Sequence, residues 1–308
     1  MATVGEWVQG ARPRTLPAAI SPVLIGTAVA WTYLHAAPAS PAGHTSISAL
    51  DIIARALLAL VVALALQVGV NYANDYSDGV RGTDAIRVGP VRLVGQGLAS
   101  PGSVKSAAFA SFAIAAMAGL ALVLITAAWW LILVGIAAIV AAWFYTGGPR
   151  PYGYSGLGEV FVFVFFGLVA VAGSTYVHTL TITWRSIGAG VASGSLAVAI
   201  LLANNLRDIP TDVVAGKKTL AVRLGDPRTR VAYSIALAIP YVIAVAIAIS
   251  GTPWALLAFA SAPLTLSPLR QVRGGAVGRG LIPVLVSTGV LLLGYAVSLS
   301  IGLVISAV

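Results

Sequence analysis

The sequence predicts an all-α integral membrane protein, built as a bundle of nine transmembrane helices. Of its 308 residues, 59% are hydrophobic and only 9% are charged, and the mean hydropathy is +0.96. A soluble domain carries about 25% charged residues, whereas a membrane helix needs about 20 mostly apolar residues in a row. Apolar stretches of that kind recur along the whole chain. We therefore expect a single transmembrane domain over residues 1–308 in a lipid bilayer.

The nine predicted spans are the apolar runs between segments that are rich in charged residues, Gly and Pro. They cover residues 15–34, 48–72, 105–126, 128–146, 157–178, 186–206, 229–250, 252–269 and 281–306. This number of spans places the N-terminus and the loops after spans 2, 4, 6 and 8 on one side of the membrane. The C-terminus is then expected on the other side.

The basic residues indicate which side is the cytoplasm. Sixteen of the 18 Lys and Arg residues fall on the side of the N-terminus, and only Arg55 and Arg185 fall opposite. By the positive-inside rule, the N-terminus is cytoplasmic and the chain is a multi-pass protein of the plasma membrane. Topology thus explains the net charge of +9. Since no soluble domain is expected to carry a basic face, we predict no nucleic-acid partner.

Two short stretches hold most of the acidic residues. "NYANDYSDGVRGTD" (71–84) and "NNLRDIPTDVVAGKK" (204–218) each follow an apolar run and fall on the cytoplasmic side. Five of the nine acids lie in these 29 residues, where a random scatter would place about one. The stretches begin 133 residues apart and lead into "VRLVG" (91–95) and "VRLG" (222–225). This similarity suggests a degenerate internal repeat of about four helices plus a loop.

Helical spacing places the polar residues of each stretch on one face. The two sets are Asn71, Asp75 and Asp78, and Asn204, Asp208 and Asp212. We expect Pro210 to bend or end the second helix, which would leave Asp212 on its loop side. A charge that faces lipid costs about 2.5–3.5 kcal/mol, so such groups turn inward and tend to be functional. Salt bridges at helix ends would explain a single aspartate, but they explain two similar clusters less well.

These side chains have the chemistry of a magnesium and diphosphate site. Mg²⁺ prefers oxygen ligands and usually binds through a few carboxylates together with substrate phosphates. The chain has no cysteine and only three scattered histidines, so sites for softer metals are not expected. Basic residues accompany the acids on the same side, namely Arg12, Arg14, Arg81, Arg150, Lys217 and Lys218. Such groups neutralise the charge that develops on a departing diphosphate.

The two acidic stretches resemble the Asp-rich motifs of the UbiA-type intramembrane aromatic prenyltransferases. The resemblance is carried by "NDYSDGVRGTD" and "NNLRDIPTDVVAGKKTLAVRLG", and it extends over essentially the whole chain. Within this superfamily, "RPRTLPAAISPVLIG" and "YTGGPRPYGYSGLGE" (145–159) look most like the 1,4-dihydroxy-2-naphthoate polyprenyltransferases of menaquinone synthesis.

The resemblance implies a cytoplasmic cap formed by the loops after helices 2 and 6, and a lateral opening to the bilayer. It implies that Mg²⁺ and the diphosphate are bound by four catalytic aspartates, Asp75, Asp78, Asp208 and Asp212, with Lys217 as a further catalytic residue. It also implies a second set that holds the diphosphate, consisting of Asn71, Asn204, Arg12, Arg81, Arg150 and Asp84.

The implied reaction transfers a polyprenyl group from polyprenyl diphosphate to 1,4-dihydroxy-2-naphthoate, with loss of CO₂ and diphosphate. The product is a demethylmenaquinol, an intermediate of menaquinone (vitamin K2) biosynthesis. One alternative is a prenyltransferase for another aromatic acceptor, and a second is a cation-coupled membrane transporter. Transporter sites lie near the bilayer midplane, whereas these acids lie at cytoplasmic helix ends. Glu159, at the start of span 5, either caps that helix electrostatically or serves the acceptor site.

Overall fold

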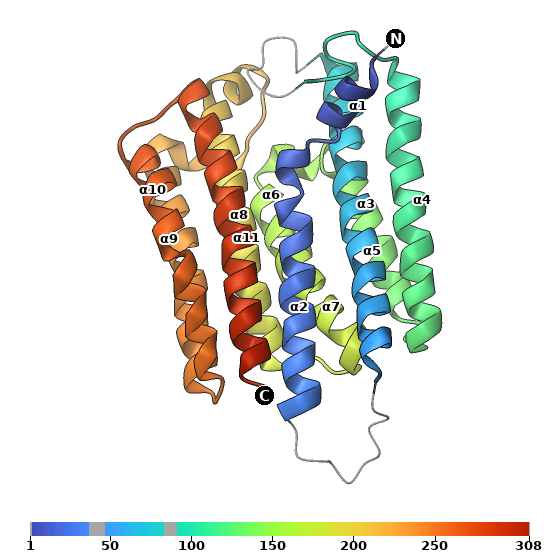
Figure 1. Cartoon of the computed structure of the whole chain (residues 1–308). Coiled ribbons are helices and arrows are strands. Elements are labelled where there is room, and N and C mark those ends of the chain that lie inside the picture. Colours follow the sequence, from blue (N-terminus) through green and yellow to red (C-terminus); the bar gives the residue numbers. More distant parts are fainter. Residues whose placement is uncertain (1, 37–46, 83–90, 308) are drawn as a thin grey trace.

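The computed structural model describes residues 2–36, 47–82 and 91–307, and every regular element in these ranges is helical. The long helices run side by side, and the N- and C-termini lie at opposite ends of them (Figure 1). The short helix α1 lies at the end of the bundle where α3 and α8 finish (Figure 1). The all-helical architecture expected from composition is therefore confirmed.

The structure has eleven α-helical elements and five 3₁₀- or π-helical elements in the described residues. In order they are α1 (Val4–Gly10), η1 (Pro13–Thr15), α2 (Pro17–Ala36), α3 (Ala49–Arg81), α4 (Pro101–Thr126), α5 (Leu131–Phe144), η2 (Tyr152–Ser155), α6 (Gly158–Val162), η3 (Phe163–Val169), α7 (Ala170–Thr179), α8 (Trp184–Val214), α9 (Leu220–Ile249), η4 (Pro253–Thr265), α10 (Leu266–Arg273), η5 (Gly278–Leu281) and α11 (Ile282–Ile305). The η elements are 3₁₀-helical, except η3, which is π-helical.

Seven helices of the described ranges are long and apolar enough to cross a membrane. They correspond to seven of the nine predicted spans, with α6, η3 and α7 forming one of them. The two other predicted spans coincide with α5, a shorter apolar helix, and with the consecutive elements η4 and α10. The 3₁₀ geometry of η4 interrupts what the hydropathy predicts as one helix.

Hydroxyl side chains begin several of the long helices. The side chains of Ser48, Ser100, Thr183 and Thr219 each accept a bond from the backbone N–H three residues on, at the starts of α3, α4, α8 and α9. At its other end α3 stops at Gly82, whose φ of 71° is easily adopted by glycine. Local sequence thus fixes where these helices begin and where α3 ends.

Both helices that carry the acidic stretches are longer than predicted. α3 continues to Arg81 and α8 to Val214, so residues 71–81 and 204–214 of the two stretches form the last turns of helices. Of the two outcomes expected at Pro210, an end of the helix is wrong, because α8 remains helical through it and Asp212 lies on the helix. Asp208 and Asp212 on either side are buried. Packing of this turn outweighs the one backbone hydrogen bond that proline removes.

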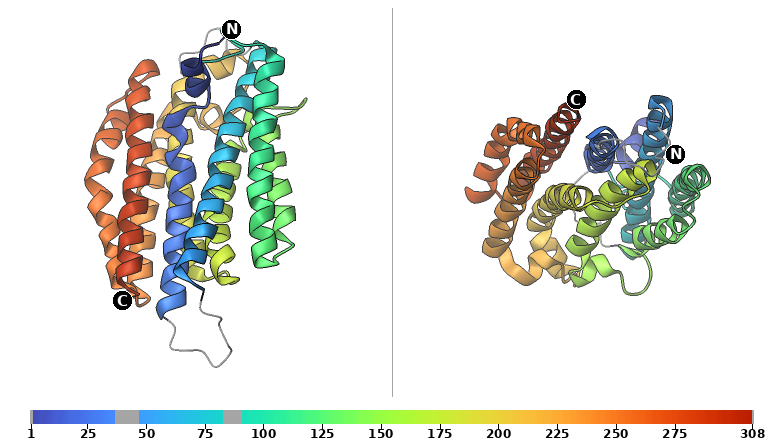
Figure 2. Two further views of the ribbon diagram at one scale, coloured as in Figure 1. Left: turned by 45° about the vertical axis from the view of Figure 1, so that its right-hand side comes forward. Right: turned by 90° about the horizontal axis from the view of Figure 1, so that it is seen from below.

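The bundle is assembled around α8. This helix packs against α9 and η3, while α3 packs along α4 and α2 along α7 and α11. The end-on view shows these helices grouped around one another (Figure 2). The largest buried apolar cluster joins α2, α8, α9 and α11, and α3 contributes to two smaller clusters.

Close approach of α8 and η3 depends on three glycines. Gly190 and Gly194 are spaced as in the GxxxG pattern of packed membrane helices, and Gly167 of η3 lies directly against them. A Cβ atom on Gly167 would lie 2.6 Å from the carbonyl oxygen of Gly190 and 2.6 Å from the Cα of Gly194. Because both neighbours are backbone atoms, neither can give way cheaply. This contact fixes the position of the π-helical turn that follows Phe161.

We therefore predict that Gly167→Ala destabilises the bundle by about 1–3 kcal/mol, the usual cost of overpacking. The measurement is the thermal unfolding midpoint of the purified protein in detergent. Gly173→Ala is the matched control, since it lies in the same transmembrane segment and its added Cβ would meet nothing within 4 Å. A Gly167→Ala protein as stable as the control would show that the two segments are not held this closely.

Candidate active site

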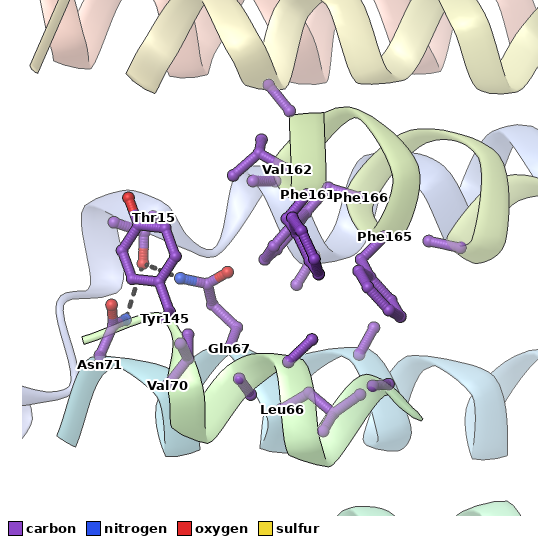
Figure 3. Close-up of a pocket in the computed structure, with 18 of the residues that line it drawn as sticks. Thr15, Leu66, Gln67, Val70, Asn71, Tyr145, Phe161, Val162, Phe165 and Phe166 are labelled. Atoms are coloured by element: carbon purple, nitrogen blue, oxygen red, sulfur yellow. Dashed lines mark hydrogen bonds between the residues drawn. The ribbon is translucent and has the colours of Figure 1, made fainter. Parts of the chain in front are cut away.

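A cavity of about 1040 Å³ lies between α2, α3, α5, η3 and α8. Its lining on α3 extends from Ala59 to Asp78, which corresponds to about 28 Å of helix at 1.5 Å per residue. One end of the cavity is polar, where it is lined by Asn74, Asp78, Arg92, Asn204, Asp212 and Lys217. The rest is mainly apolar, and Figure 3 shows its middle part. The cavity therefore has the shape of a long apolar channel with a charged end.

The charged end is organised around Asp78, which is 2% exposed. Lys217 Nζ lies 3.6 Å from its Oδ1 atom, and Arg92 Nη2 lies 3.9 Å from its Oδ2 atom. The hydroxyl of Tyr154 donates a hydrogen bond to the same carboxylate, and Lys217 Nζ lies 4.3 Å from the centre of the Tyr154 ring. Buried charges are tolerated only when they are paired in this way.

Backbone hydrogen bonds hold the segments that bring these groups together. The N–H of Lys217 donates to the carbonyl of Asp212 at 2.8 Å, so the lysine is fixed directly after α8. The N–H of Lys218 donates to the carbonyl of Tyr154, also at 2.8 Å. The segment after α5 and the segment after α8 are therefore bonded to each other, and both contact Asp78 near the end of α3.

The second acidic stretch forms a cluster of its own on α8. Arg207 donates to both carboxylate oxygens of Asp208 at 2.7 Å, and to the amide oxygen of Asn204 at 2.9 Å. Asn204, Arg207 and Asp212 belong to the cavity lining, whereas Asp208 lies behind them. Two-point pairing of this kind fixes the arginine in position.

Asp75 is fully buried and contacts the backbone after α3. Its Oδ2 atom accepts from the N–H of Leu93 at 2.7 Å, and its Oδ1 atom accepts from the N–H of Val94 at 3.1 Å. Both oxygens of this carboxylate are thus bonded to a single loop, and Asp75 is not among the cavity-lining residues. The loop carries Arg92, so Asp75 positions this arginine near Asp78.

Asn71 connects α3 to the N-terminal segment. Its Nδ2 atom donates to the carbonyl of Ala11 at 2.9 Å and to the hydroxyl of Thr15 at 3.0 Å. Arg12, between these two residues, has a left-handed backbone with φ of 55° and lines the cavity. Asn71 therefore secures the turn that brings the predicted arginine to the site.

Two of the predicted arginines, Arg81 and Arg150, do not belong to the cavity lining. Arg81 donates to the carbonyls of Thr146 and Gly148, and its guanidinium lies 5.6 Å from the centre of the Tyr154 ring. Arg150 is exposed and does not line the cavity. Asp84 lies outside the described residues.

Several residues of the site were not predicted from the sequence. Arg92 belongs to "VRLVG", whose sequence signal is that of a repeat, and Tyr154 lies in "YTGGPRPYGYSGLGE", whose signal is a family resemblance. Asn74 also lines the cavity, and its amide oxygen accepts from the hydroxyl of Thr146 at 2.7 Å. The sequence signal that could have identified Asn74 is its position directly before Asp75 in the first acidic stretch.

Glu159 is directed toward α8. Although it lies in the first turn of α6, its Oε1 atom accepts a hydrogen bond from Asn205 Nδ2 at 2.9 Å. Glu159 is buried, and Asn205 lines the cavity. This bond supports α8 beside the cavity, so the residue does more than cap its own helix.

Aromatic rings form one wall of the cavity beyond the charged end. Tyr145 and Tyr152 meet edge to face at 5.5 Å between centres, Tyr152 stacks on Phe161 at 4.0 Å, and Phe161 lies 6.1 Å from Phe165. Burial raises the pKa of the Tyr152 hydroxyl, which donates to the carbonyl of Ala141 at 2.8 Å. The π-helical geometry of η3 sets the direction of Phe165.

The donor set suits a magnesium ion that binds together with an anionic ligand. Within residues 2–36, 47–82 and 91–307, no three His, Cys, Asp or Glu side chains come together as a metal cage. Asp78 and Asp212 nevertheless line the same cavity from two helices, with amide oxygens of Asn74 and Asn204 near them in sequence. Mg²⁺ is commonly held by one or two carboxylates plus substrate phosphates. The residues therefore fit the metal when a phosphorylated ligand completes its coordination.

Comparison with known proteins identifies one family over most of the chain. The model of the UbiA prenyltransferase family matches residues 19–280. A 1,4-dihydroxy-2-naphthoate octaprenyltransferase of Mycobacterium tuberculosis is 53% identical over 301 residues, which cover 97% of each chain. The Escherichia coli protein of the same name is 41% identical over 231 residues, covering 73% of this chain and 70% of its own.

The fold is also found among solved structures. A UbiA homologue from Archaeoglobus fulgidus bound to DMAPP and Mg²⁺ superposes with a TM-score of 0.61 at 15% identity, covering 96% of this chain and 99% of its own. At this identity the likeness concerns the fold alone. It shows that the helical arrangement described above is one that other membrane proteins of this kind adopt.

The bonds of Asp75 predict a local effect on the loop that carries Arg92. Asp75→Asn replaces one acceptor oxygen by an NH₂ group, which faces a backbone N–H, and this change weakens two hydrogen bonds to a charged group. We expect faster amide hydrogen exchange over residues 91–99, measured by mass spectrometry of the protein in detergent. Asp51→Asn, exposed in the first turn of the same helix, serves as the comparison and should leave the exchange of Leu93 and Val94 slow. Equal exchange in the two variants would contradict the assigned role of Asp75.

Proposed function

Because the chain belongs to the UbiA prenyltransferase family, we propose that it transfers a polyprenyl group from polyprenyl diphosphate to 1,4-dihydroxy-2-naphthoate. The reaction releases diphosphate and CO₂ and gives a demethylmenaquinol for menaquinone biosynthesis. Relatives at 41–53% identity over most of this chain carry the name of this activity.

The observation that carries the proposal is the two-part character of the cavity. A polyprenyl diphosphate has a long apolar tail and a highly charged head. The cavity offers apolar walls over about 28 Å of α3 and buried cations at one end, with Arg92, Arg207 and Lys217 all less than 10% exposed. This arrangement accepts the tail inside the bundle and holds the head at the end where α3 and α8 finish.

Asp78 and Asp212 would hold Mg²⁺ with the diphosphate, since both carboxylates line the cavity. When bound, the ion neutralises the diphosphate and stabilises it as a leaving group. Asp208 supports this site by fixing Arg207, and Asp75 supports it by fixing the loop of Arg92. Lys217, close to Asp78, takes up charge as the bond to the diphosphate breaks.

The remaining predicted residues have roles around the same site. Asn204 and Arg12 line the cavity and contact the diphosphate, while Asn71 holds the turn of Arg12. Arg81 and Arg150, which lie outside the cavity lining, would attract the anionic donor toward its charged end. Asp84 contributes from the cap between α3 and α4.

The chain's apolar wall protects the reacting carbon. Breaking the bond between C1 and the diphosphate oxygen leaves positive charge on an allylic centre, which water would quench. The aromatic wall lines the cavity next to the charged end, so it excludes water and presents ring faces to the cation.

The electrons and atoms of the carbon–carbon bond-forming step then balance without an external reagent. The ring carbon that bears the carboxylate attacks C1, and the electron pair of its bond to the carboxylate returns to the ring as CO₂ leaves. Diphosphate departs with the electron pair of the broken C–O bond. The chain's task is to hold the ring beside C1 in a cavity that contains little water.

We further propose that all nine predicted spans cross the membrane, including α5 and the segment of η4 and α10. An odd number of spans agrees with the termini at opposite ends of the bundle (Figure 1). The charged end of the cavity lies at the same end of the bundle as the N-terminus. The distribution of basic residues assigns this end to the cytoplasm. The loops after α3 and α8 would cap the site there, and the C-terminus would lie outside.

The proposal predicts turnover in proteoliposomes supplied with 1,4-dihydroxy-2-naphthoate, a polyprenyl diphosphate and Mg²⁺. Lipid-soluble product and CO₂ should form in equal amounts, and EDTA should abolish both. Asp78→Asn should lower the rate by about 10²–10³-fold, because a group that stabilises the leaving diphosphate is weakened. Asp51→Asn is the matched control, since it lies exposed in the first turn of the same helix.

Two results would contradict this function. If the protein prenylates another aromatic acceptor and leaves dihydroxynaphthoate unchanged, it is still a prenyltransferase of this family, but dihydroxynaphthoate is not its acceptor. Full activity in EDTA, or in the Asp78→Asn protein, would remove the metal and diphosphate site from the end of α3.

A further inference from the structure

Gln67 is a polar residue in the apolar part of the cavity. It lies on α3 one turn before Asn71 and is 6% exposed, and its neighbours Leu66 and Val70 line the same wall. Along the helix it precedes Asp78 by 11 residues, which places it about 16 Å deeper than the charged end. None of the roles assigned above uses this amide.

The hydrogen bonds of Thr15 fix the orientation of the Gln67 amide. The Thr15 hydroxyl donates its single hydrogen to the carbonyl of Arg12 at 2.8 Å, so its oxygen can only accept from other residues. It accepts from Gln67 Nε2 at 2.9 Å and from Asn71 Nδ2 at 3.0 Å. The nitrogen of Gln67 must therefore face Thr15, and its oxygen must face the other way.

This oxygen lacks a donor. Gln67 Oε1 is buried and accepts no hydrogen bond from the described part of the chain. Figure 3 shows the Gln67 nitrogen toward Thr15 and the oxygen on the opposite side, toward Phe161. Buried acceptors are nearly always paired, so an unpaired one on a residue that lines a cavity points to a ligand that supplies the donor.

The groups across the cavity from Gln67 suit a flat aromatic ligand. Phe161 and Phe165 lie nearly parallel, with 22° between their ring planes, and both line the cavity (Figure 3). Aromatic rings pack favourably on such faces, either offset or edge on. An apolar wall of rings opposite a single hydrogen-bond acceptor is suited to a phenol or naphthol.

We propose that Gln67 Oε1 accepts a hydrogen bond from a hydroxyl of the aromatic acceptor, and that the acceptor ring packs along Phe161 and Phe165. This inference rests on the proposed function and adds a specificity-determining residue to it. In 1,4-dihydroxy-2-naphthoate, the hydroxyl next to the carboxylate is engaged by that carboxylate. The hydroxyl at position 4 has no such internal partner and is the one that reaches Gln67.

The assignment explains how the site selects its acceptor. A naphthoate without the 4-hydroxyl would leave Gln67 Oε1 buried and unpaired, and sites built around a hydrogen bond discriminate against ligands that lack the donor. The position also suits the reaction, because the ring would lie deeper in the cavity than the diphosphate. Its reacting carbon can then meet C1 from the side opposite to the leaving group.

The test compares two probes, 1,4-dihydroxy-2-naphthoate and 1-hydroxy-2-naphthoate, which differ by the 4-hydroxyl. Their dissociation constants are measured by anaerobic calorimetry on the full chain in lipid nanodiscs. Wild-type protein should bind the first about tenfold more tightly than the second. Gln67→Met, of similar size and without an acceptor oxygen, should remove this difference while leaving the affinity for 1-hydroxy-2-naphthoate unchanged. Gln271→Met on α10, outside the cavity lining, is the control and should keep the difference.

The wild-type comparison tests the inference even if Gln67→Met fails to fold. Equal affinity of wild-type protein for the two probes, or a tenfold difference that persists in Gln67→Met, overturns the role of Gln67. Wild-type protein that prenylates dihydroxynaphthoate and still gives either result overturns this inference alone. Wild-type protein that neither binds nor prenylates dihydroxynaphthoate overturns the proposed function together with it.

Discussion

The pairing of Asp78 with buried cations at the end of α3 is the interaction on which the rest of the structure depends. Three groups from separate segments, Arg92, Tyr154 and Lys217, converge on this carboxylate within an apolar bundle. Removing one partner of a buried ion pair commonly costs about 3–5 kcal/mol, because the remaining charge stays buried and unpaired. The loops that carry these residues are therefore held in place by charge, and the site they form is already organised before a ligand enters.

The same constraint explains the division of labour among the aspartates. A cluster of four carboxylates facing one cavity would repel one another without a metal ion. In this protein Asp75 is bonded to backbone amides and Asp208 to an arginine, which leaves Asp78 and Asp212 at the cavity. In the proposed function, Asp75 and Asp208 position cations, and Asp78 and Asp212 would receive the metal with the diphosphate. The apolar remainder of the cavity would then serve the prenyl chain and the aromatic ring.

Much of this could be predicted from the sequence, because membrane spans and acidic clusters leave strong local signals. Hydropathy located the seven helices that are long and apolar enough to cross a membrane. The acidic stretches marked α3 and α8 as the helices that carry the site, although both helices run past the predicted spans. The sequence could not show that α8 continues through Pro210, because tertiary packing rather than local propensity decides whether the helix continues there. Nor could it show the roles of Arg92 and Gln67. These roles depend on the contact of Arg92 with Asp78, 14 positions away in sequence, and on the contact of Gln67 with Thr15, 52 positions away. The interruption of the eighth span by η4 has no clear signal in the hydropathy.

The most direct test of the central claim is to locate the metal. Crystals of the full chain with Mn²⁺ and a non-hydrolysable prenyl diphosphate analogue would give anomalous difference density at the metal position. The account predicts a peak in contact with the diphosphate and with carboxylates from both α3 and α8, including Asp78 and Asp212. Diphosphate bound without a metal, or a peak that contacts only one of these helices, would contradict it.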